Sequence, residues 1–180
     1  MRRSSVVLMT LPALLLAGTD VPRFEDYPQP TDWHGPVAPI KLITRSERMF
    51  RTRLTEASQE QPDFAGHYKF AGWGCGSNCG AGAIVDLQTG EVYAPPLGGK
   101  GEGWQRWISC TALFDGTGYE YHPNSRLMIV RCGWNFDQDG KNRPDVYYLL
   151  WEKTQFRQLL HIPAKPQNHT AKSPSKTKAR

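Results

Sequence analysis

Oxygen-bearing side chains alternate within residues 135–145, NFDQDGKNRPD, in a pattern that resembles a calcium-binding loop. The candidate ligands are Asn135, Asp137, Asp139 and Asp145. Gly140 would permit the sharp turn that such a loop needs, but Val146 stands where an EF-hand has its closing glutamate. A hairpin with an Asp-Gly turn explains the same residues and is the interpretation we favour. Calcium is therefore an alternative cofactor, and no other cofactor is indicated.

A second chemical possibility centres on His67, whose imidazole could act as a general base near neutral pH. Glu102 and Asp115, in the long loop region, are the carboxylates that could assist it, which would make the protein a cell-envelope hydrolase. The spacing of the two carboxylates does not set the separation that a glycosidase requires. A structural histidine at the start of a strand is the interpretation we favour, so catalysis is kept as an alternative.

Trp104 and Trp107 lie in a glycine-rich stretch and are candidates for an exposed binding surface. Tryptophan can stack on sugar rings or anchor a protein partner, because it combines a large apolar area with one polar group. The two tryptophans could equally well form a satellite core. If they are exposed, the partner would be a protein or an envelope polysaccharide.

The four cysteines, Cys75, Cys79, Cys110 and Cys132, predict two disulfides. Three pairings are possible, and we favour Cys75 with Cys79 and Cys110 with Cys132. The first bond would close a tight loop, and the second would tie the long loop to a core strand. Each would contribute about 2 to 4 kcal/mol. A zinc site would have to recruit His67 or His122, and the CxxxC spacing is not typical of zinc or thioredoxin-type motifs.

The N-terminal segment indicates export. Arg2 and Arg3 precede the apolar run 6–17, so residues 1–19 are predicted to be a removable signal peptide and the mature protein to be periplasmic or secreted, without a transmembrane segment. The five basic residues beyond 162 lie in a predicted disordered tail, 163–180. The whole chain carries a net charge of +5. Without Arg2, Arg3 and the five basic residues of the tail, residues 4–162 carry a net charge of −2, which argues against nucleic-acid binding.

The elements that position these side chains are predicted to form one domain, residues 20–162. A proline-rich arm at 20–42 precedes a helix near 45–59, where Thr44 and Glu47 have capping-box spacing. Strands are predicted at 67–73, 83–87, 91–93, 126–132, 145–151 and 156–161, with a turn at Asp86–Gly90 in which the carboxylate accepts backbone N–H groups. The predicted class is α+β: a mostly antiparallel, meander-like sheet with one N-terminal helix, stapled by disulfides.

The motifs FAGHY at 64–68, WGCG at 73–76 with a second cysteine, and IVDLQTGEVY at 84–93 resemble an uncharacterised family of small secreted bacterial proteins. SRL at 125–127 and YYLLW at 147–151 are similar to later segments of that family. The resemblance spans roughly residues 45–160, and it implies export, the first disulfide and a β-rich fold. It implies no catalytic residue.

Together these features favour an exported binding protein, with a periplasmic inhibitor or immunity-type protein as one form of it. A cell-envelope hydrolase and a calcium-dependent binding module are the alternatives.

Overall fold

The computed structural model describes residues 20–31, 33–76, 79–98, 118–133, 141 and 143–164, with the backbone alone for Cys79. The elements are η1 (Phe24–Asp26), α1 (Arg45–Met49), α2 (Arg51–Ser58), β1 (Tyr68–Gly76), β2 (Cys79–Asp86), β3 (Val92–Tyr93), β4 (Tyr119–Tyr121), β5 (Leu127–Cys132), β6 (Asp145–Trp151) and β7 (Phe156–Ile162). No helix in these ranges is long and apolar enough to cross a membrane.

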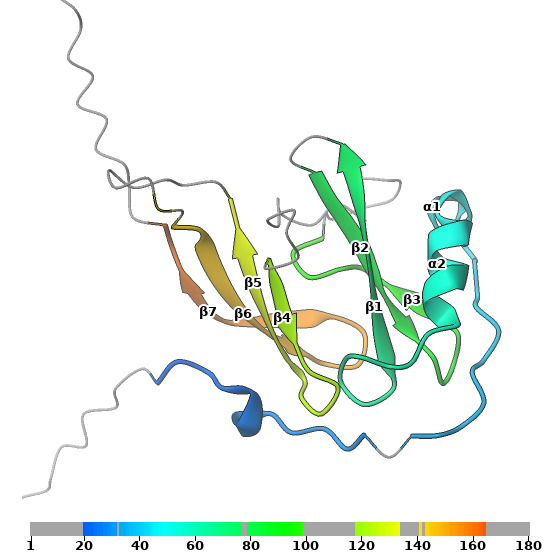
Figure 1. Cartoon of the computed structure of the whole chain (residues 1–180), viewed down its shortest axis with the longest axis horizontal. Coiled ribbons are helices and arrows are strands. Elements are labelled where there is room, and N and C mark those ends of the chain that lie inside the picture. The colour runs from blue at the N-terminus through cyan, green and yellow to red at the C-terminus, as the bar shows by residue number, and fades with distance from the viewer. Residues whose placement is uncertain are drawn as a thin grey trace, which may run out of the picture.

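The strands form two antiparallel sheets, one in the order β1-β2-β3 and one in the order β4-β5-β6-β7 (Figure 1). The β-rich, antiparallel part of the predicted fold is confirmed, and the strands of each sheet follow one another as in a meander, but they form two sheets in place of one. The reason is visible in β2, where Ile84 points to one core cluster while Ala83 and Val85 belong to another. A sheet that is apolar on both faces must be covered on both faces.

The inner core lies between the two sheets. Phe64, Tyr68, Phe70 and Ile84 come from the β1–β2 side, and the opposite sheet adds its own buried residues. Those residues are Met128, Val130, Cys132, Leu149 and Trp151. This packing of two sheets creates the surface on which the candidate site forms.

Helix α2 covers the other face of the first sheet, as Figure 1 shows. Leu54 and Ala57 are buried there. The predicted Thr44–Glu47 capping box is confirmed by hydrogen bonds in both directions, at 2.7 and 3.1 Å. The predicted continuous helix is instead two segments. Phe50 breaks the helix with a ψ of 17° and packs its ring 5.0 Å from that of Trp73.

The N-terminal arm runs along both sheets. Gln29 N–H donates to the Asn124 carbonyl, and Lys41 N–H donates to the carbonyl of Gly90 at 2.7 Å. Gly90 has a φ of 76°, and a Cβ there would lie 2.1 Å from the Pro39 carbonyl oxygen. The arm is therefore held where only glycine permits so close an approach.

Candidate functional site

A pocket of about 550 Å³ opens where the two sheets and the arm meet. Its size lies within the range of small-molecule sites. The arm contributes Pro28 and Gln29, and the start of β1 contributes Ala65, His67 and Tyr68. The remaining lining residues come from the β2–β3 hairpin and the second sheet: Asp86, Gln88, Tyr93, Arg126, Trp151, Lys153 and Thr154.

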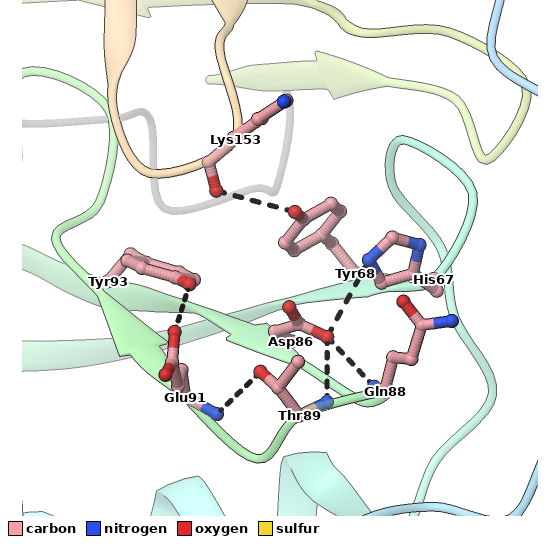
Figure 2. A network of polar contacts seen from close by, with 8 residues as sticks. All are labelled: His67, Tyr68, Asp86, Gln88, Thr89, Glu91, Tyr93 and Lys153. Atoms are coloured by element: carbon pink, nitrogen blue, oxygen red, sulfur yellow. Dashed lines mark hydrogen bonds and ion pairs between the residues drawn. The ribbon is translucent and has the colours of Figure 1, made fainter.

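One polar wall of the pocket is built by the turn that follows β2. Asp86 Oδ1 accepts the N–H of Gln88 at 2.8 Å and that of Thr89 at 3.1 Å, which confirms the predicted turn chemistry (Figure 2). Because the turn fixes this carboxylate, Asp86 is a fixed anion in the pocket wall. Its side chain is 6% exposed.

His67 lies beside that carboxylate, with Nε2 3.6 Å from Asp86 Oδ1 (Figure 2). The separation is too long for a direct hydrogen bond, so the two groups interact electrostatically. The imidazole is 22% exposed, and its ring centroid lies 4.3 Å from that of Tyr68. The His67 carbonyl also accepts the Leu87 N–H at 3.1 Å. The strand pairing thus fixes the position of the imidazole next to the pocket.

Two tyrosine hydroxyls are anchored around the pocket (Figure 2). Tyr68 donates to the Lys153 carbonyl at 3.3 Å, and Tyr93 donates to Glu91 Oε2 at 2.6 Å. Burial raises the pKa of both hydroxyls, and the bond to Glu91 raises the pKa of Tyr93 further. The bond from Tyr93 in turn lowers the pKa of the Glu91 carboxyl. At neutral pH both tyrosines are therefore uncharged and act as hydrogen-bond donors.

Trp151 forms the back of the pocket and is the largest of the fully buried side chains. Its ring centroid lies 4.9 to 6.2 Å from those of four other aromatic residues, Phe64, Tyr68, Tyr93 and Phe156. The indole N–H is buried and approaches the Tyr68 hydroxyl without reaching hydrogen-bond geometry. A buried donor without a partner costs free energy unless something satisfies it.

Arg126 and Lys153 are the two cations of the pocket. Neither has an ion-pair partner among the described residues, whereas Arg131, on the neighbouring strand β5, pairs with Glu120 at 2.7 Å. The backbone of Arg126 is held on both sides, since its N–H donates to Tyr27 and its carbonyl accepts the Trp151 N–H, each at 2.9 Å. The pocket thus combines fixed aromatic rings with positive charge that has no ion-pair partner in the part of the chain that the structure describes.

Of the residues that sequence analysis proposed for catalysis, only His67 lies in the described structure, and its carboxylate neighbour is Asp86. Glu102 and Asp115 lie outside the described residues, as do Trp104, Trp107, Asn135, Asp137 and Asp139. Asp145 is described, and its Oδ1 accepts a hydrogen bond from the Ala164 N–H and lies 2.9 Å from His161 Nε2. Within the described ranges, no cluster of three or more acidic, histidine or cysteine residues could hold a metal ion.

Sequence analysis did not find the pocket itself. The predicted turn role of Asp86 is confirmed, but the sequence does not predict that His67 lies beside this carboxylate. No local sequence pattern marks Arg126 and Lys153 as pocket residues, because only the pairing of β5 with β6 brings them to the same pocket. The FAGHY motif did point to one wall, because it contains Ala65, His67 and Tyr68.

Cys75 and Cys132 are both disulfide-bonded, and no described cysteine is free. No disulfide joins two of the described side chains, however, so the pairing stays a prediction. The β1–β2 register places Cys79 opposite Gly76, next to Cys75, which is compatible with the favoured first bond.

No family model matches the chain, and no curated protein or solved structure matches it significantly. The resemblance to a family of secreted proteins therefore rests on the sequence motifs alone, and the function must be argued from the pocket.

Proposed function

We propose that the protein is an exported bacterial binding protein whose small-molecule ligand occupies the pocket between the two sheets. The observation that carries the proposal is the pocket itself, about 550 Å³ in volume and walled by His67, Tyr68, Tyr93 and Trp151. Sites for small molecules combine aromatic surface with a few fixed polar groups, as this pocket does.

Binding explains the geometry better than catalysis does. A general base must lie within hydrogen-bond reach of the proton it removes. Among the described residues, His67 has no hydrogen-bonded hydroxyl or thiol, and Asp86 already accepts two backbone N–H groups. The His67–Asp86 pair nevertheless makes the cell-envelope hydrolase the second candidate, and turnover of a bound molecule would reveal it.

The proposal keeps the predicted disulfides, Cys75 with Cys79 and Cys110 with Cys132. They would stabilise the ends of β1, β2 and β5 in an oxidising compartment, where a small domain gains from such cross-links. An exposed Trp104–Trp107 surface belongs to the same set of proposals, and a calcium-dependent module at Asn135, Asp137, Asp139 and Asp145 stays an alternative; the pocket depends on neither.

A bulky substitution at the pocket mouth tests the proposal. Thr154 lines the pocket and is exposed, so Thr154→Trp should fill the opening without disturbing the core. The probes are four single-ring molecules: methyl glucoside, methyl glucuronide, 2-phenylethanol and phenylacetate. We expect at least one to bind the native protein with a dissociation constant near 1 mM, the range of such small ligands. Thr154→Trp should weaken that binding at least tenfold in an NMR titration.

Gln155→Trp is the matched control, because Gln155 is an exposed neighbour that does not line the pocket. It should bind like the native protein. Unchanged binding in Thr154→Trp, or binding of none of the four probes, would contradict the proposed function. Consumption of a probe would favour the hydrolase instead.

A further inference from the structure

Among the described residues that line the pocket, cationic side chains outnumber anionic ones. Asp86 contributes one negative charge, and Arg126 and Lys153 contribute two positive charges. The Lys153 carbonyl accepts the Tyr68 hydroxyl and the Lys153 side chain is exposed, so Arg126 is the cation on which the binding of an anion depends. No ion pair among the described residues joins Asp86 to either cation, and its Oδ1 accepts the N–H groups of Gln88 and Thr89.

Arg126 is the cation best placed to hold an anion. It is partly buried, and both of its backbone hydrogen bonds, to Tyr27 and from Trp151, fix the base of the side chain. A guanidinium presents donors in a planar fork that matches a carboxylate in two parallel hydrogen bonds. An arginine that is fixed, partly buried and without an acidic partner among the described residues is suited to bind such a group.

Lys153 lies at the mouth of the pocket. Its φ of 65° is in the left-handed region, which an L-residue adopts at a cost, and its carbonyl holds the Tyr68 hydroxyl at 3.3 Å. The ammonium group is exposed, so its attraction for an anion is screened by water and salt. We therefore expect Lys153 to assist and Arg126 to dominate.

The aromatic side chains of the pocket indicate what the uncharged part of the ligand is. Tyr93 lines the pocket and is only half-buried, so its ring offers a surface against which a flat or chair-shaped ring can pack. Arg126 is the partly buried cation of the lining, and one carboxylate matches its single positive charge and its planar fork of donors.

We propose that the ligand is a ring-bearing monocarboxylate, either a sugar acid or an aromatic acid. Its carboxylate is bound by Arg126, and its ring packs against the tyrosines of the pocket, Tyr68 and Tyr93. This inference rests on the proposed function, because it names the ligand class of the same pocket. It goes further in assigning Arg126 as the residue that selects for the anion.

Two matched probe pairs test the selection, each with the same ring and either a carboxylate or a hydroxymethyl group: methyl glucuronide against methyl glucoside, and phenylacetate against 2-phenylethanol. We expect at least one carboxylate to bind at least tenfold more tightly than its neutral partner. Which pair shows the difference separates a sugar acid from an aromatic acid. Arg126→Gln should remove the difference between each carboxylate and its neutral partner, and Arg126→Lys should retain part of it.

Arg157→Gln is the control, because Arg157 is exposed, pairs with Glu152 at 2.7 Å and does not line the pocket. It should bind all probes like the native protein. Equal binding of charged and neutral probes, blocked by Thr154→Trp, would overturn the anion inference and leave the proposed function intact. Binding of no probe would overturn both. Circular dichroism of each variant verifies that it is folded, and if Arg126→Gln is not, Arg126→Lys carries the test.

Discussion

Replacing Gly90 with alanine will lower the free energy of unfolding by about 3 kcal/mol. Strain of the left-handed backbone contributes about 1 kcal/mol, and the loss of two backbone hydrogen bonds contributes about 1 kcal/mol each. The added Cβ would lie 2.1 Å from the Pro39 carbonyl oxygen and 2.9 Å from its carbon, and no side-chain rotation can relieve a contact between backbones. The arm must move away, and with it the hydrogen bonds from Ala38 to Leu87 and from Lys41 to Gly90. Urea denaturation measures the loss.

Gly74→Ala is the matched control in the same sheet. A Cβ at Gly74 meets nothing within 4 Å, and the residue has no positive φ. We expect its stability to stay within about 1 kcal/mol of the native protein, with a slight increase favoured by the reduced freedom of the unfolded chain. Equal effects of the two substitutions would mean that the arm does not pack against the Asp86–Gly90 turn as described.

Replacing Trp151 with alanine will cost about 4 kcal/mol, the usual effect of removing a large aromatic side chain from a core. Trp151 is 1% exposed and packs against rings from both sides of the inner core. Since small domains are stable by only about 5 to 15 kcal/mol, this loss removes a large part of the total stability. Thermal and urea denaturation both report this loss.

Trp151→Phe separates packing from hydrogen bonding at the same position. The indole N–H has no hydrogen-bond partner among the described residues, so losing it should cost nothing beyond the smaller ring. We expect a loss of about 1 to 2 kcal/mol, in the range of partial truncations in a core. If phenylalanine is as costly as alanine, the indole N–H makes an interaction that this account lacks.

Local features of the fold were predictable because their physical causes are local. The Thr44–Glu47 cap and the Asp86–Gly90 turn each depend on groups only a few residues apart, and both were confirmed. Hydrophobic alternation located β1, β2, β5 and β6 to within a few residues. The three-residue strand β4 was missed, because so short a segment shows no alternation.

The separation into two sheets and the pocket between them could not be predicted in the same way. The hydrogen bond from Tyr68 to Lys153 spans 85 residues, and His67 meets Asp86 across a strand pair. Contacts of this kind depend on how the sheets pack, which no local pattern encodes. The sequence therefore indicated His67 as a candidate catalytic residue. It did not indicate Asp86 as the neighbouring carboxylate, and Glu102 and Asp115 were proposed instead.

The central claim is that a ligand binds in the pocket between the sheets, and the most direct test is a map of backbone amide chemical shifts as methyl glucuronide or phenylacetate is added to the native protein. The account predicts that the largest shifts fall on Gln29, Gln88, Lys153 and Thr154, which surround the pocket from three separate segments of the chain. Largest shifts on the far side of the first sheet, at helix α2, would contradict it, as would a titration that leaves the four pocket amides unmoved.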